Sequence, residues 1–159
     1  MTTADRVTVT TTGVARTRAL GRRLARALQA GDIVLLRGQL GAGKTALAQG
    51  VGAGLKVEGP VRSPTFVLLA RHEGATPLYH ADLYRLTTVE EVEELALAEQ
   101  AADGVLLVEW PERGPAALPP EHLLVELELV AGAPDERRIT FIAAGARYRR
   151  LLDRIAARG

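Results

Sequence analysis

The 159-residue chain contains no cysteine, no asparagine and a single serine. The missing cysteines exclude a disulfide scaffold, a catalytic thiol and a cysteine-bound zinc site. No stretch reaches the roughly 18 to 20 uninterrupted apolar residues of a membrane-spanning helix, and the N-terminus lacks the basic-then-apolar order of a signal peptide. These absences predict a cytoplasmic protein without membrane contact. The length favours a single domain over residues 1–159.

The chain also has little net charge and very little lysine. Twenty Lys and Arg residues oppose nineteen Asp and Glu residues, which gives a formal charge of +1. No overall basic field therefore points to nucleic acid or to a membrane. Lysine occurs only at positions 44 and 56, so a lysine inside a motif is less easily explained by chance.

Apolar periodicity predicts strands that alternate with helices. Strands are expected at residues 6–10, 33–36, 66–70, 77–84, 105–108, 123–130 and 138–143, and helices at 14–29, 43–55, 88–102 and 146–158. The third and fourth strands form one predicted hairpin, and the last two form another. This order predicts a three-layer α/β fold whose central sheet is mixed, with parallel strands and antiparallel hairpins.

Residues 38–45 read Gly-Gln-Leu-Gly-Ala-Gly-Lys-Thr and match the phosphate-binding pattern G-x-x-x-x-G-K-[ST]. The segment lies between a predicted buried strand and a predicted helix, as a P-loop NTPase fold requires. Lys44 would reach the β- and γ-phosphates, and the Thr45 hydroxyl would bind Mg²⁺. Backbone groups would line the phosphates at Gly38, Leu40, Gly41, Ala42 and Gly43.

Acidic residues follow two other predicted strands. Glu109 ends the run Val105–Val108, where a P-loop enzyme needs a carboxylate for Mg²⁺ or for the attacking water. A solvated glutamate at a strand end is the alternative. Asp82 shares one strand face with His80 and Tyr84, unless that strand is an edge strand with a wet face. Thr65 lies in Ser-Pro-Thr-Phe (63–66), where it would sense a γ-phosphate, although Ser-Pro also marks ordinary turns.

Four motifs occur in a fixed order: the loop at 38–45, Ser-Pro-Thr-Phe at 63–66, His-Ala-Asp-Leu-Tyr-Arg-Leu at 80–86 and Val-Glu-Trp-Pro-Glu at 108–112. Over roughly residues 7 to 143 the chain resembles the bacterial TsaE (YjeE) family, small P-loop ATPases of tRNA threonylcarbamoyladenosine synthesis. The resemblance implies ATP and Mg²⁺ as cofactors and a TsaB–TsaD pair as partner. ATP hydrolysis would reset that pair, and the TsaE-like subunit would not itself transfer the threonylcarbamoyl group.

The resemblance also implies residue roles. Lys44 and Thr45 would bind phosphate and Mg²⁺, and Glu109 would be the second Mg²⁺ ligand. Further roles fall to four residues: Asp82 and Thr65 in hydrolysis, and Trp110 and Glu112 beside the nucleotide. Two positions depart from the family pattern. Gln39 stands where an acidic residue is usual, and Ala70-Arg71-His72 replaces a stretch that usually carries a tyrosine.

Two other function classes stay open at this point. A small-molecule P-loop kinase would need an arginine-rich lid, for which Arg113 is the one candidate. A binding module would hold ATP only as a structural ligand. The arginines of the last predicted helix fit a solvated face better than an RNA-binding one, which leaves a weak or indirect tRNA contact. No spacing of His, Asp and Glu suggests a permanent metal site beyond nucleotide-bound Mg²⁺.

Overall fold

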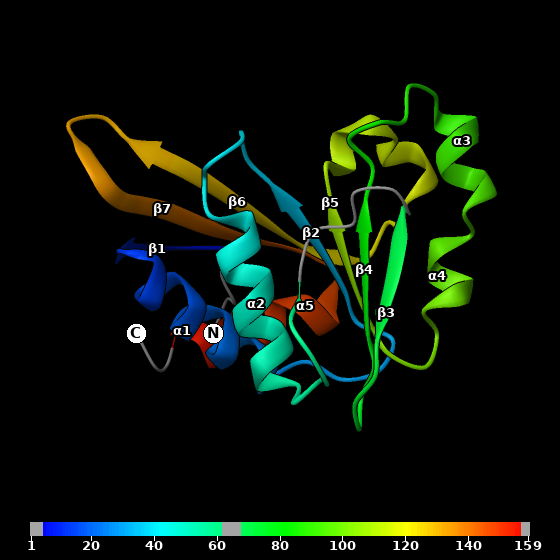
Figure 1. Ribbon diagram of the computed structural model, residues 1–159, viewed down its shortest axis with the longest axis horizontal. Helices are drawn as coiled ribbons and strands as arrows, with labels where there is room; N and C mark the ends of the chain where they lie inside the picture. The colour runs from blue at the N-terminus through cyan, green and yellow to red at the C-terminus, as the bar shows by residue number, and fades with distance from the viewer. Residues whose placement is uncertain (1–4, 62–67, 157–159) are drawn as a thin grey trace.

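The computed structural model describes residues 5–61 and 68–156. Within them, seven strands form one sheet in the order β1-β7-β6-β2-β5-β4-β3 (Figure 1). The strands are β1 (Arg6–Thr12), β2 (Ile33–Arg37), β3 (Leu69–His72), β4 (Leu78–Asp82), β5 (Val105–Glu109), β6 (His122–Val130) and β7 (Ala133–Ala144). The α-helices are α1 (Val14–Ala25), α2 (Lys44–Gly54), α3 (Val89–Glu94), α4 (Leu97–Gln100) and α5 (Ala146–Ala156), and two 3-10 turns are η1 (Pro111–Arg113) and η2 (Pro115–Ala117).

The sheet is mixed, as predicted. Strand β2 is parallel to both β5 and β6, and β4 is parallel to β5. The predicted hairpins are the antiparallel pairs β3–β4 and β6–β7, and β1 is antiparallel to β7. Two antiparallel pairings in succession make β1 parallel to β6. The carboxyl ends of β1, β2, β4, β5 and β6 therefore lie along one edge of the sheet.

Helices cover both faces of the sheet and give the predicted three layers. Strand β5 shows the division, because Val105 and Leu107 point to one face and Leu106 and Val108 to the other. The first face packs against α1, α2 and α5, and the second against α3 and α4 (Figure 1). Burial on both faces explains why the central parallel strands are short continuous apolar runs. None of the helices in the described ranges is long and apolar enough to cross a membrane.

Helices α1 and α2 approach each other through glycine. A Cβ atom on Gly21 of α1 would collide with the Leu47 carbonyl oxygen of α2. A Cβ atom on Gly50 of α2 would collide in turn with the Arg18 carbonyl oxygen of α1. Any larger residue at either position would push the two backbones apart, so the sequence requires glycine at this crossing.

Some predicted boundaries are wrong. The single helix expected at 88–102 is two short helices, because Ala96 takes a left-handed conformation with φ 46°. Its predicted N-terminal capping box is present, with Glu91 N–H donating to the Thr88 hydroxyl. The first helix ends at Ala25 instead of 29, β3 ends at His72 instead of 70, and β7 begins five residues before its predicted start. The predicted start of β3, at residue 66, lies outside the described residues.

Candidate functional site

The glycine-rich loop 38–43 connects β2 to α2 at the carboxyl edge of the sheet. Gly41 and Gly43 have φ values of 82° and 105°, in the left-handed region that favours glycine. A Cβ atom on Gly38 would lie 2.7 Å from the Leu127 carbonyl oxygen. Residues with a side chain would not fit this loop, because it needs left-handed backbone angles and a close contact with β6. The N-terminus of α2, where the loop ends, has no side-chain cap. An uncapped helix N-terminus at a glycine loop is suited to bind an anion.

Strand register brings the predicted acidic residues to this loop. Glu109 at the end of β5 is level with Leu36 of β2 on one side and with Asp82 of β4 on the other. The loop and the two strand ends enclose a pocket of about 320 Å³. Its lining consists of Leu40, Gly41, Gly43, Lys44, Thr45, Asp82, Glu109 and Trp110. Most of the residues predicted for the site from three separate motifs thus line one pocket.

Lys44 is the most unusual group in the pocket, because it is only 5% exposed. Within the described ranges, its Nζ atom has no hydrogen-bond partner. The ammonium instead lies 3.8 Å from the centre of the Trp110 ring. Burial lowers the pKa of Lys44, while the carboxylates of Glu109, Glu112 and Asp82 act in the opposite direction. A buried cation that lacks a hydrogen-bond acceptor fits a site whose acceptor is a phosphate oxygen.

Glu109 is buried, with 3% of its surface exposed, so the solvated strand-end alternative is wrong. Its Oε2 atom lies 2.6 Å from Nε2 of His80 on the neighbouring strand. His80 is fully buried. A buried carboxylate facing a phosphate-binding loop has the oxygen ligands and the charge that Mg²⁺ prefers.

Asp82 lies on β4, which is flanked by β5 and β3, so the edge-strand alternative is also wrong. Its Oδ1 atom accepts a hydrogen bond of 2.9 Å from the Tyr84 backbone N–H. Burial raises the pKa of Asp82, and the nearby Glu109 carboxylate adds to the rise, whereas the Tyr84 hydrogen bond opposes it. A carboxylate whose pKa is raised toward neutrality is better able to accept a proton than an ordinary aspartate.

Aromatic side chains close one side of the pocket. Trp110 has a φ of 59°, which is rare for a bulky residue, and its ring lies over the Lys44 ammonium. Tyr84 packs on Trp110 with ring centres 4.9 Å apart. The Arg113 guanidinium lies 5.3 Å from the Tyr84 ring centre and 5.9 Å from that of Trp110. Glu112 is exposed next to these side chains, and its negative charge raises the pKa of Lys44.

The predicted site is incomplete in one part and larger in another. Thr65 and the rest of the 63–66 motif lie outside the described residues. Sequence patterns missed His80 as a partner of Glu109, and they missed Arg137 altogether. Arg137 reaches from β7 to the outer side of the loop, where its Nη2 donates to the Gly41 carbonyl oxygen over 3.2 Å. No motif marks either contact, since each depends on how distant strands pair.

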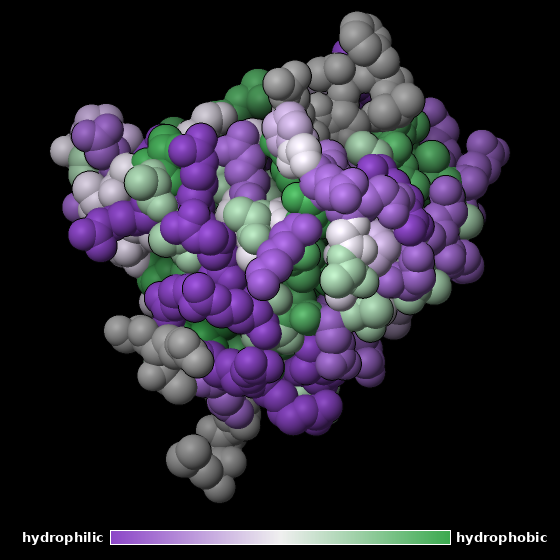
Figure 2. Space-filling model, turned by 60° about the horizontal axis from the view of Figure 1, so that its bottom comes forward, coloured by the Kyte–Doolittle hydropathy of each residue, from purple (hydrophilic) through white to green (hydrophobic). Residues whose placement is uncertain are grey.

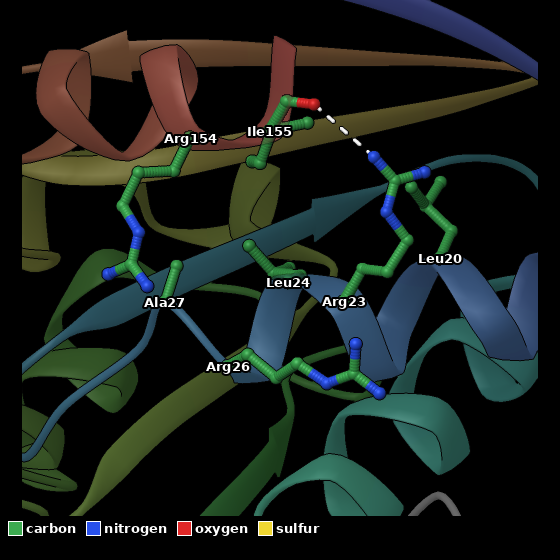
Figure 3. Close-up of a pocket in the computed structure, with 7 residues that line it drawn as sticks. All are labelled: Leu20, Arg23, Leu24, Arg26, Ala27, Arg154 and Ile155. Atoms are coloured by element: carbon green, nitrogen blue, oxygen red, sulfur yellow. Dashed lines mark hydrogen bonds between the residues drawn. The ribbon is translucent and has the colours of Figure 1, made fainter. Parts of the chain in front are cut away.

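Another cavity, between α1 and α5, is far smaller. It measures about 30 Å³, and Arg23 closes one side by donating to the Ile155 carbonyl oxygen (Figure 3). That volume accommodates water at most. In the described part of the chain, no three His, Asp or Glu side chains are grouped as a metal site. A Mg²⁺ ion would therefore need oxygens from its phosphate ligand as well as from protein.

Comparison with known proteins decides the family. Residues 11–139 match the family described as "Threonylcarbamoyl adenosine biosynthesis protein TsaE". The chain belongs to the TsaE family. It is 43% identical to the TsaE protein of Streptomyces coelicolor over 137 residues, which cover 82% of this chain and 93% of that protein. It is 39% identical to TsaE of Bacillus subtilis, over 88% of this chain and 87% of that one.

A solved structure agrees with this assignment. The crystal structure of Bacillus subtilis YdiB superposes with a TM-score of 0.78 at 31% sequence identity. The match covers 96% of this chain and 95% of YdiB. As a TsaE family member, the protein has its role in the biosynthesis of tRNA threonylcarbamoyladenosine.

Proposed function

We propose that the protein is a single-domain, Mg²⁺-dependent ATPase that serves as an accessory subunit in tRNA threonylcarbamoylation. The observation that carries the proposal is the buried Lys44 ammonium, which has no hydrogen-bond partner among the described residues. It projects from a glycine-rich loop into a pocket that also holds two carboxylates. Retaining such a cation costs stability unless a ligand anion binds it.

The roles follow from position. Lys44 and the backbone N–H groups of the loop would bind the phosphates. Thr45 at the start of α2 and Glu109 at the end of β5 would hold Mg²⁺, which when bound neutralises charge on the β- and γ-phosphates. Asp82, half-buried and with a raised pKa, would orient or deprotonate the attacking water. Thr65 is assigned to hydrolysis by its motif alone.

Trp110 would respond to the nucleotide. Its ring now contacts the same ammonium that the phosphates would bind. When Lys44 turns to a phosphate oxygen, the ring loses this cation, and its packing on Tyr84 and Arg113 changes with it. A change at the β- and γ-phosphates is thereby converted into a change at the surface, because Tyr84 and Arg113 are both exposed. Glu112 lies within this group.

We assign a TsaB–TsaD-type complex as the partner, and the cytoplasm as the location where tRNA is modified. Four large apolar side chains are exposed in the described chain: Val14, Leu40, Tyr84 and Leu129. Each follows or ends a strand whose carboxyl end lies at the pocket edge of the sheet. They are spread along the sheet edge that holds the pocket, and we take that edge as the side that meets the partner. Contact with tRNA would then be weak or indirect, through the partner.

A small-molecule kinase is the alternative. Its one candidate lid residue, Arg113, lies against the rings of Tyr84 and Trp110. A pocket of about 420 Å³ does adjoin the loop at Gly38 and Gln39, and Glu126 and Glu128 line it. Arg37 lines the same pocket and pairs with Glu126 over 3.6 Å, so part of its negative charge is already compensated. A module that binds ATP without hydrolysis would have no use for Asp82, whose burial raises its pKa.

The test is ATP hydrolysis by the purified protein, with and without TsaB–TsaD, beside a Lys44→Ala variant. We expect slow hydrolysis that rises in the complex and disappears in the variant. A lone domain without an arginine from a partner is expected to be slow. Rapid turnover that ignores the partners and responds to a small acceptor molecule would favour the kinase instead.

A further inference from the structure

His80 lies in the middle of β4, directly beneath the pocket. It is level with Leu107 of β5 and with Ala70 of β3, between two neighbouring strands. None of its surface is exposed. A ligand in the pocket therefore cannot touch it, and any influence on chemistry must pass through another residue.

The residue it contacts is Glu109. The 2.6 Å separation of His80 Nε2 and Glu109 Oε2 is that of a strong hydrogen bond. An ionised carboxylate can only accept, so the proton lies on Nε2 and the imidazole donates. The other ring nitrogen, Nδ1, has no hydrogen-bond partner among residues 5–61 and 68–156.

Packing alone does not explain this histidine. Leu78 precedes it on the same face of β4 and belongs to the apolar core of that face. A leucine at position 80 would bury a similar volume and leave no unpaired nitrogen, and an unpaired buried polar atom costs stability. The ring is thus a poor core residue but a good donor to one carboxylate oxygen.

We propose that His80 is a positioning residue for the Mg²⁺ ligand Glu109. By holding Oε2, it fixes the plane of the carboxylate at the end of β5 and keeps the group turned to the pocket. Outer-shell partners of this kind orient metal ligands, and their loss typically costs 10- to 100-fold in metal affinity. The inference rests on the proposed Mg²⁺·ATP site.

The test measures ATP binding by calorimetry over a series of Mg²⁺ concentrations. For His80→Leu we expect the half-saturating Mg²⁺ concentration to rise about tenfold. The affinity for ATP without Mg²⁺ should stay within about twofold of wild type, whereas the melting temperature should fall because the buried Glu109 carboxylate loses a donor. A residue that only supports the fold would lower both affinities together.

Two conservative variants distinguish the role of the Nε2 hydrogen-bond donor from that of the imidazole ring itself. The amide nitrogen of Gln reaches the place of Nε2, whereas that of Asn reaches only the place of Nδ1. His80→Gln should therefore recover most of the Mg²⁺ affinity, and His80→Asn should not. This contrast stays decisive if His80→Leu folds poorly. His72→Gln is the matched control, because His72 also has a buried Nε2 atom without a partner in the described chain.

A double variant tests the route through Glu109. In a Glu109→Gln background, adding His80→Leu should leave the Mg²⁺ response where Glu109→Gln alone put it. An unchanged Mg²⁺ response in His80→Leu, or equal behaviour of the Gln and Asn variants, would overturn the inference. If wild-type protein bound no ATP at all, the proposed function itself would fail, and the two failures are therefore distinguishable.

Discussion

The two halves of the sheet differ in what they bury. In the parallel half, β2, β5 and β4 end in a pocket with a buried ammonium at Lys44 and a buried carboxylate at Glu109. In the antiparallel half, β6, β7 and β1 bury apolar side chains such as Phe141 and Ile139. The polar partners there are ordinary hydroxyl pairs, as between Thr8 and Thr140. The parallel half thus retains groups that cost stability, within an apolar core to which both halves contribute.

The largest expected effect is a loss of stability on substitution of Phe141 in the antiparallel half. This side chain is fully buried in the core shared with α1, α2 and α5. Phe141→Ala should lower the free energy of unfolding by about 3–5 kcal/mol, measured by urea denaturation. ATP affinity of the folded fraction should remain within about twofold of wild type. Phe141→Leu should cost less than about 1.5 kcal/mol. A loss of ATP binding that matches the loss of stability would contradict the division between the halves.

Lys44→Met should have the opposite effect, a loss of ATP affinity without a loss of stability. The substitution keeps most of the volume and removes the charge, so ATP affinity should fall about 100-fold or more through loss of a charge-assisted bond. The melting temperature should be unchanged or higher, because burial lowers the pKa of Lys44 and thus opposes its charged form at neutral pH. Lys56→Met, at the exposed second lysine, is the control. A clearly lower melting temperature would show that Lys44 supports the fold.

Asp82→Asn should reduce hydrolysis about 100-fold while ATP stays bound. The pKa of Asp82 is raised in the folded protein, so its stability contribution is complete below its ordinary pKa and is lost as pH rises through the raised value. At neutral pH the variant should therefore melt about 1–3 °C higher, and the difference should vanish in acid. Hydrolysis by wild type should fall on acidification at a pH above the usual range for aspartate. Asp153→Asn, an exposed change on α5, should alter neither property.

The smallest expected effect is optical. Trp110 is the one tryptophan of the chain, and a cation lies on its ring. Mg²⁺·ATP should change its emission as the ammonium moves to phosphate, and ADP should change it less. Lys44→Met should show the altered emission without nucleotide and no response on addition. Equal spectra of wild type with and without ATP, at saturating concentration, would argue against the Trp110 movement.

Features determined by short stretches of chain were predictable from sequence. The loop at 38–45, the acid that ends β5 and both hairpins depend on local patterns of glycine, apolar runs and turns. The conformation at Ala96 was not predictable, because alanine favours the helix that this residue interrupts. The helix expected at 88–102 is consequently divided.

Contacts between distant strands were also beyond prediction. The His80–Glu109 hydrogen bond exists because β4 and β5 pair in one register, and a shift by one residue would turn His80 to the other face. The Trp110 ring reaches Lys44 through a left-handed backbone that no residue preference suggests. Arg137 meets the loop across the sheet from β7. Each needs tertiary structure that the chain patterns do not specify.

Hydrophilic and apolar side chains are unevenly distributed over the surface. Seen from below, the molecule shows a predominantly hydrophilic surface with smaller apolar areas (Figure 2). The large exposed apolar side chains of the described chain instead accompany the carboxyl edge of the sheet.

The glycine crossing of α1 and α2 has a mechanical consequence. Gly21 and Gly50 bring peptide groups against peptide groups, with no rotatable side chain between them to absorb movement. We therefore expect α1 and α2 to move as one rigid unit. Lys44 and Thr45 lie at the end of this unit, in the first turn of α2. Binding of the proposed nucleotide would therefore not tilt α2 alone. Movement would instead fall to Trp110 and to Tyr84, which packs on it, while the backbone of Lys44 and Thr45 keeps its place.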